Sequence, residues 1–300
     1  MEINNNNFLR WAEYPYVKDT KFVPCPYPTE KNNLPYMPVL VPGEVTAFYV
    51  NVANGVEYTK GFKLNLITPD GTIILESIAA VLLDSIEEDR FNFVCYLTCP
   101  NTTVGVYRLQ IKNSDNTLDL RSNMVRVMTS GFEDNTTIVR YRNNGRNLFG
   151  FNWVVLKNFY QQYRLHIFRI DQQPEYNIEQ YRSSTTGKLR NLNGTMDRFV
   201  KFQSYYFDKG AHEACEALLF HSEIWINGKL YTFKTGYSSE PLIASKRSKG
   251  EFELWDEGFS SLNYCSGTEG LPYDFRYLAD NLGRRIIINK NQRIIVKTSI

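Results

Sequence analysis

Hydrophobic and polar residues alternate in a series of short runs between residues 41 and 130. The run at 45–52 alternates, and the runs at 62–68 and 72–78 flank a Pro-Asp-Gly turn. Alternation is typical of strands that bury one face, and an Asp-Gly turn between two such runs is a strong hairpin signal. Further runs follow at 91–98, 106–111 and 123–128. About six or seven strands over this length predict a β-sandwich.

One of these runs carries a tyrosine in a distinctive setting. Gly105-Val106-Tyr107-Arg108-Leu109 resembles the tyrosine-bearing strand of immunoglobulin-like and fibronectin-like domains, where the ring closes a corner by bonding to backbone. An ordinary strand tyrosine is the alternative. The resemblance favours an immunoglobulin/fibronectin-like sandwich over residues 41–130.

Residues 137–300 are expected to form a second, β-rich domain with a short helix. A polar, turn-rich stretch at 129–136 is the predicted boundary, and Asn227-Gly228 predicts a hairpin turn. The predicted strands are 137–142, 163–170, 199–207, 224–226, 229–234, 252–255, 285–289 and 292–297. The helix is predicted at 209–221, where apolar residues share one face, namely Ala211, Ala214, Cys215, Leu218 and Leu219.

Residues 1–40 combine prolines with aromatic residues and predict an extended arm. Proline at this density prevents regular helices and ladders, whereas the rings need a surface to pack on. The arm either wraps its own domain or docks on a neighbouring subunit, and we predict the second. The expected partner contacts are Phe8, Trp11, Tyr14, Tyr16 and Tyr27.

Composition and charge restrict the classes of protein to which this chain is expected to belong. With 34 Lys and Arg against 32 Asp and Glu, the net charge is +2, and no basic stripe indicates specific nucleic-acid binding. No stretch is apolar enough to span a bilayer, and the first residues lack the pattern of a secretory signal, so we expect neither membrane insertion nor export by that route. Five scattered cysteines indicate reduced, packed thiols.

No group of residues predicts a catalytic or metal site. In a zinc-protease helix the second His stands four residues after the first, and the residue four after His212 is Glu216. We therefore interpret Cys215 as a core thiol and His212 and His221 as surface residues, and His166 as a structural histidine. Acidic pairs such as Asp256-Glu257 are interpreted as solvated turns. No phosphate-binding or dinucleotide motif is present, so no enzyme activity, metal or cofactor is expected.

Two segments of the second half carry a resemblance to a known group of proteins. The first is Ile138-Val139-Arg140-Tyr141-Arg142-Asn143-Asn144 with Phe149-Gly150-Phe151 and the alternating Arg164 to Ile170, and the second is Ala217 to Tyr231 with its strand-Asn-Gly-strand hairpin. Both resemble tail proteins of phages that infect the Bacteroidetes, including crAss-like phages. The resemblance implies a virion structural protein of the tail, collar or baseplate. It also implies a ring of identical copies that contacts other tail or neck proteins and assembles in the host cytoplasm.

A carbohydrate-binding or glycan-degrading β-sandwich protein is the alternative. Trp153, Trp225 and Trp255 would supply platforms for stacking sugars. The missing export signal and the small number of histidines argue against it.

Overall fold

The computed structural model describes residues 2–3, 7–14, 36–53, 62–79, 81–83, 90–101, 104–114, 118–129, 136–145, 147–154, 156, 158–241, 248–257, 264–265, 276–279, 285–288 and 294–296. The chain divides into two compact units. The first comprises Met1–Gln173 and Phe199–Gly258, and the second comprises Pro174–Arg198 and Phe259–Ile300. The fold is mainly β, with one short helix in the described part and a large mixed sheet.

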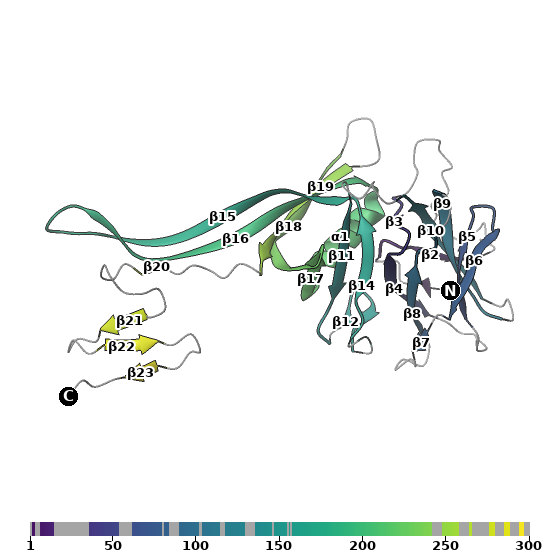
Figure 1. The fold of residues 1–300 in the computed structure, drawn as a ribbon, viewed down its shortest axis with the longest axis horizontal. Coiled ribbons are helices and arrows are strands. Elements are labelled where there is room, and N and C mark those ends of the chain that lie inside the picture. The colour runs from purple at the N-terminus through teal and green to yellow at the C-terminus, as the bar shows by residue number, and fades with distance from the viewer. Residues whose placement is uncertain are drawn as a thin grey trace. The chain divides into compact units, whose positions relative to one another are not determined.

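The first half of the chain forms two sets of paired strands (Figure 1). In one set β4 pairs with β1 and β8, and β8 pairs with β7. In the other, β9 pairs with β5 and β10, and β5 pairs with β6, while β2 and β3 pair with β10. All these pairs are antiparallel except β3 with β10. The strands are β1 (Glu2–Ile3), β2 (Trp11–Glu13), β3 (Val39–Leu40), β4 (Val45–Ala53), β5 (Lys63–Ile67), β6 (Ile73–Ala79), β7 (Val81–Leu83), β8 (Arg90–Thr98), β9 (Gly105–Lys112) and β10 (Asp119–Val127).

Alternation in β4 and β8 separates two layers of buried side chains. Phe48 lies opposite Cys95, and both belong to the main hydrophobic core. Tyr49 lies opposite Val94 and belongs to a second cluster, which the segment around Phe151 and Trp153 completes. Side chains of successive strand residues point to opposite faces, so both faces of this strand pair are covered.

The second half of the first unit continues the pairing. β14 pairs with β11, β11 with β17, β17 with β18, β18 with β19 and β19 with β16. Single pairings also join β14 to the first half, with Gln162 opposite Ala47 and Arg164 opposite Val39. The elements are β11 (Thr137–Arg142), β12 (Asn147–Leu148), β13 (Phe151–Asn152), β14 (Gln161–Leu165), β15 (Ile167–Arg182), β16 (Leu189–Phe207), α1 (Lys209–Leu219), β17 (Glu223–Ile226), β18 (Lys229–Pro241) and β19 (Ser248–Asp256).

The predicted boundary at 129–136 lies mostly outside the described residues. Arg164 of β14 nonetheless links the two halves of the first unit. Its Nε lies 2.7 Å from Oε2 of Glu44, and its guanidinium also donates a hydrogen bond to the Thr136 hydroxyl at 3.0 Å. The predicted domains 41–130 and 137–300 stay predictions.

Helix α1 forms where the sequence predicts it and ends two residues earlier. Its N-cap is Asp208, whose carboxylate accepts a hydrogen bond from the Ala211 backbone N–H. The five predicted face residues are buried, and the helix packs near β18. Among the described residues, no helix has the length and apolar character needed to cross a bilayer.

The predicted Asn-Gly hairpin is confirmed between β17 and β18. Asn227 and Gly228 have φ of 49° and 79°, the left-handed pair that a tight hairpin turn requires and that these two residue types adopt readily. The Asn227 side chain also accepts from the Ile138 backbone N–H at 3.0 Å, which fixes the turn against β11.

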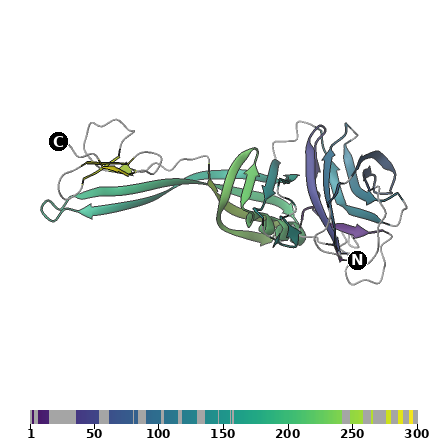
Figure 2. The ribbon, with the colours of Figure 1, turned by 90° about the horizontal axis from the view of Figure 1, so that it is seen from below.

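A long hairpin of β15 and β16 was not predicted beyond its base. The strands have 16 and 19 residues and lie side by side in both views (Figure 1, Figure 2). The Ser183 backbone N–H donates to the Lys188 carbonyl at 2.9 Å and closes the turn. Most side chains of β15 from Arg169 onwards are exposed.

The second unit contains the outer part of this hairpin and C-terminal strands. β20 (Tyr264–Cys265) pairs with Asn193 and Gly194 of β16. β21 (Arg276–Ala279), β22 (Arg285–Ile288) and β23 (Ile294–Val296) form a separate antiparallel sheet, and the last two correspond to the predicted strands 285–289 and 292–297.

Candidate functional site

Two of the five aromatic residues predicted to contact a partner fill the core of their own chain. Phe8 and Trp11 are each 1% exposed. The Phe8 ring lies 5.6 Å from that of Tyr163 and 6.0 Å from that of Phe207, and the Trp11 ring lies 5.6 Å from that of Phe48. In this structure, therefore, neither ring is available to a neighbouring subunit.

Backbone hydrogen bonds hold this N-terminal segment in place. Its strand β2 pairs with β10, and Asn123 of β10 donates its side-chain amide to the carbonyls of Phe8 and Tyr36, each at 3.1 Å. The Asn123 side-chain oxygen accepts from the Arg10 N–H at 3.0 Å. One buried asparagine thus satisfies three backbone groups that the proline-rich segment cannot pair by itself.

Of the other three aromatic residues predicted to contact a partner, the structure describes Tyr14 alone. Tyr14 is 42% exposed, and the Arg121 guanidinium carbon lies 3.4 Å from its ring centroid. A role for Tyr14 in a partner contact stays a prediction. Tyr16 and Tyr27 lie outside the described residues.

The prediction that His212 and His221 lie on the surface is wrong, because both are buried. His212 belongs to a polar cluster at the start of α1, where its Nδ1 lies 2.5 Å from the Tyr237 hydroxyl and its Nε2 lies 2.5 Å from the Ser248 hydroxyl. Tyr237 in turn lies 3.0 Å from the Ser204 hydroxyl. Burial lowers the pKa of His212, so the ring is neutral near pH 7.

This cluster has part of the geometry of a nucleophilic site, and the nearby Asp208 carboxylate raises the pKa of His212 by less than burial lowers it. A serine paired with a histidine needs a third group that stabilises the imidazolium, and an ionised carboxylate usually supplies it. Here Tyr237 stands in that place, and burial raises its pKa so that it stays neutral. The hydroxyls and the neutral imidazole satisfy one another's hydrogen bonds.

Buried cysteines and the absence of ligand clusters characterise the rest of the described interior. Cys95, Cys99 and Cys215 are buried and form no disulfide, as predicted. Burial raises the pKa of Cys99 to about 11, so it stays a thiol near pH 7. Within the described ranges, no group of three or more His, Cys, Asp or Glu side chains is placed to hold a metal ion.

Trp153, one of the three possible sugar platforms, is fully buried and cannot stack on a ligand. It packs on His221, with ring centroids 5.2 Å apart. Trp225 and Trp255 are partly exposed, and Trp255 packs edge-on against Phe199. The acidic pair at 256–257 also differs from its interpretation as a solvated turn, because Asp256 is buried and pairs with Lys229 at 2.5 Å.

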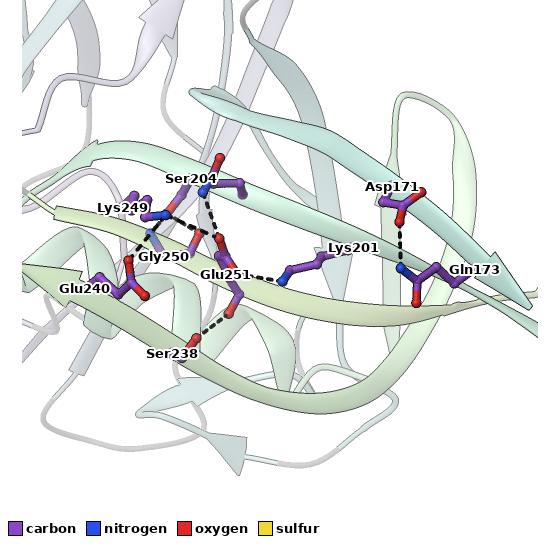
Figure 3. A network of polar contacts seen from close by, with 10 residues as sticks. Asp171, Gln173, Lys201, Ser204, Ser238, Glu240, Lys249, Gly250 and Glu251 are labelled. Atoms are coloured by element: carbon purple, nitrogen blue, oxygen red, sulfur yellow. Dashed lines mark hydrogen bonds and ion pairs between the residues drawn. The ribbon is translucent and has the colours of Figure 1, made fainter. Parts of the chain in front are cut away.

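A charged network covers the base of the long hairpin (Figure 3). Glu251 of β19 pairs with Lys201 of β16 at 2.7 Å and with Lys249 at 3.6 Å, and Lys249 also reaches Glu240 of β18 at 3.3 Å. The hydrogen bond from Lys201 contributes most to lowering the pKa of Glu251. Exposed pairs add little stability singly, so we interpret the network as fixing the register of the three strands.

Exposed apolar side chains occur on several strands and turns of the described structure, and two groups of them are relevant to assembly. On the outer hairpin, Tyr176, Ile178 and Leu189 are 60%, 45% and 51% exposed. In the first unit, Phe149 and Phe220 are 38% and 62% exposed and lie beside Phe233, which is 38% exposed. Large exposed apolar groups in clusters mark interaction sites. The sequence signal for the hairpin was the apolar alternation of Tyr176 and Ile178 within a polar run.

Comparison with protein-family models finds none that matches the chain, and comparison with curated proteins finds no match either. The resemblance to phage tail proteins therefore stays a prediction.

Proposed function

We propose that this chain is a structural subunit of a tailed-phage virion, which forms part of the tail, collar or baseplate as a ring of identical copies. The observation that carries the proposal is the β15–β16 hairpin with its exposed Tyr176, Ile178 and Leu189. A long two-stranded ribbon with apolar side chains in water is an aggregation hazard for a protein that works alone. A subunit that buries the ribbon in an assembly instead removes these side chains from water, which stabilises the assembly.

The fold within this proposal is an immunoglobulin-like sandwich in the first half of the chain. In immunoglobulin domains, strands A, B, E and D form one sheet, and G, F and C form the other, to which variable domains add C′. Assigning β1, β4, β5, β6, β7, β8, β9 and β10 to A, B, C, C′, D, E, F and G in chain order reproduces each of those pairings. Tyr107, on strand F in this assignment, is buried in the core.

The proposed function involves no catalysis. His212, which pairs with the hydroxyl of Ser248, is held by neutral hydroxyls. The expected partners are copies of the chain and other tail or neck proteins, and the expected location is the virion tail after assembly in the host cytoplasm.

Imaging the purified protein and measuring the mass of its oligomers test the proposal. Negative-stain microscopy with native mass spectrometry at micromolar concentration should give closed rings of one defined copy number. A monomer at every concentration up to about 100 μM, well above the dissociation constants of stable interfaces, would contradict the proposal. A glycan array run on the same protein tests the carbohydrate-binding alternative, for which specific binding to one sugar class is the supporting result.

A further inference from the structure

Three phenylalanine rings form an exposed aromatic patch in the first unit. Phe220 follows the last residue of α1, Phe233 lies on β18, and Phe149 lies in the turn between β12 and β13. The Phe220 ring lies 5.7 Å from that of Phe233 in a stacked arrangement and 5.9 Å from that of Phe149. We call these three residues the Phe patch.

The backbone at Phe149 is held in an unfavourable conformation. Its φ is 51°, in the left-handed region that a bulky residue rarely adopts and that Asn or Gly would normally fill. Such strain persists where the neighbouring structure enforces it, and it concentrates at functional positions. Here the strained turn places an exposed ring beside Phe220, which burial in the core cannot explain.

Acidic side chains border the Phe patch along α1. The exposed residues of the helix are Lys209, Glu213 and Glu216, and the exposed Phe220 follows at its end. Glu216 stands four residues before Phe220, so the two lie on the same side of the helix. Lys209 pairs with Glu213 at 3.6 Å. The patch therefore combines three rings with a negative edge.

The end of the long hairpin has the complementary character. Residues 180–192, which we call the hairpin tip, contain three basic residues and no acidic one. Arg182, Lys188 and Leu189 are exposed. Because Ser183 pairs with Lys188 at the turn, Arg182 lies opposite Leu189, and the two side chains share one face of the ribbon. The tip thus presents an apolar side chain beside positive charge.

We propose that the hairpin tip of one copy docks on the Phe patch of the next copy, with Leu189 against the rings and Arg182 on the same face of the ribbon toward Glu213 and Glu216, while Lys188, at the turn, adds to the positive charge of the tip. This inference rests on the proposed function, since a ring of identical subunits needs two different surfaces that fit each other. The occupant is a second copy because this chain itself carries both the apolar and the charged complement of the patch.

Charge reversal on the two surfaces tests the contact. One variant carries Glu213→Lys and Glu216→Lys, and a second carries Arg182→Glu and Lys188→Glu. All four side chains are exposed, so the fold is expected to survive, and circular dichroism with thermal melting checks this for each variant. The control exchanges the exposed Lys63–Glu76 pair, as Lys63→Glu with Glu76→Lys, which belongs to neither surface.

Each reversed variant alone should fail to form rings in native mass spectrometry, with association weakened at least tenfold, whereas the control should assemble like the wild type. Mixing the two reversed variants in equal amounts should restore assembly with strict alternation, because each patch then meets a tip of opposite charge. Phe220→Ala should weaken assembly in the same way without a change of charge, as expected for a central interface aromatic.

The outcomes separate this inference from the proposed function. If the wild type forms rings and both reversed variants form them equally well, the proposed docking contact is wrong, but the proposed ring-forming function is supported. If the wild type stays monomeric, both proposals fail. If each variant is impaired but mixing restores nothing, while one chain carrying all four reversals behaves as wild type, the contact lies within a single chain and the proposal is overturned.

Discussion

Arg10 and Asp208 form an ion pair of 2.7 Å that joins the N-terminal segment to the N-cap of α1. Both side chains are largely buried, and Asp208 also caps the helix through the Ala211 N–H. With Phe8 and Trp11 on either side of Arg10 in the core, the segment is part of the folded body. Residues 7–13 therefore contribute to folding.

Truncating the core rings of this segment should destabilise the fold. Phe8→Ala and Trp11→Ala are each expected to lower the free energy of unfolding by about 3–5 kcal/mol, because each leaves a cavity among buried aromatic side chains. Chemical denaturation measures it. Tyr14→Ala, which removes an exposed ring and its contact with Arg121, is the matched control and should cost about 1 kcal/mol or less. Equal losses for Trp11→Ala and Tyr14→Ala would contradict the placement of Trp11.

Acidification should destabilise the protein through His221. Burial lowers the pKa of His221 to about 4, below its ordinary value of 6.5. The Nδ1 atom lies 2.9 Å from the Ala217 carbonyl, and Nε2 has no hydrogen-bond partner among the described residues, so a second proton would be buried without an acceptor. Because the folded pKa is the lower one, the unfolded chain binds the proton first, and stability falls as the pH drops below 6.5.

The expected loss between pH 7 and pH 5 is on the order of 2 kcal/mol from this residue. His212, whose pKa is also lowered, adds to it in the same direction. Urea unfolding at pH 7, 6 and 5 measures the slope. His221→Gln should flatten it, whatever its effect on stability at pH 7. An unchanged slope in His221→Gln would assign the pH dependence to other groups.

Relieving the backbone strain at Phe149 should cost no stability. Phe149→Asn places a residue that tolerates the left-handed conformation at φ 51°. The free energy of unfolding should stay level or rise by about 1 kcal/mol. Phe151→Ala, two residues away but 1% exposed, is the control and should lose about 3–5 kcal/mol. A loss above about 2 kcal/mol for Phe149→Asn would show that its ring stabilises the monomer.

The sequence predicts those strands that bury one face. In β11, Val139 and Tyr141 are buried while Arg140 and Arg142 are partly exposed, and this alternation is legible from residue types. The outer part of β15 and β16 has no buried face to impose such a pattern, so its polar residues resembled a loop. Pro174 within β15 also departs from the residue types typical of a strand interior.

The hydrogen-bond partners of His212 in the polar cluster also escaped prediction, but for a different reason. His212 meets Tyr237 and Ser248 only because β18 and β19 return beside α1, 25 and 36 residues later in the chain. An isolated histidine on a helix gives no sign of such partners. Likewise, the rings of Phe8 and Trp11 were recognisable as needing burial, but the sequence does not specify whether the covering surface belongs to the same chain.

Shortening the long hairpin should separate assembly from folding. Replacing residues 175–196 with an Asn-Gly turn removes Tyr176, Ile178 and Leu189 but keeps the base of β15 and β16, including the pairing of Phe199 to Phe207 with β19. The removed side chains whose burial the structure describes are largely exposed, so the unfolding free energy of the first unit should change by less than about 1 kcal/mol. Ring formation, measured by light scattering and native mass spectrometry, should be lost. The control replaces only Ser184, Thr185 and Thr186 with glycine, which leaves the basic and apolar side chains in place and should still assemble. If the shortened chain forms rings as readily as the wild type, the hairpin has no part in assembly, whereas a collapse of the melting temperature would show that the hairpin supports the core of its own unit.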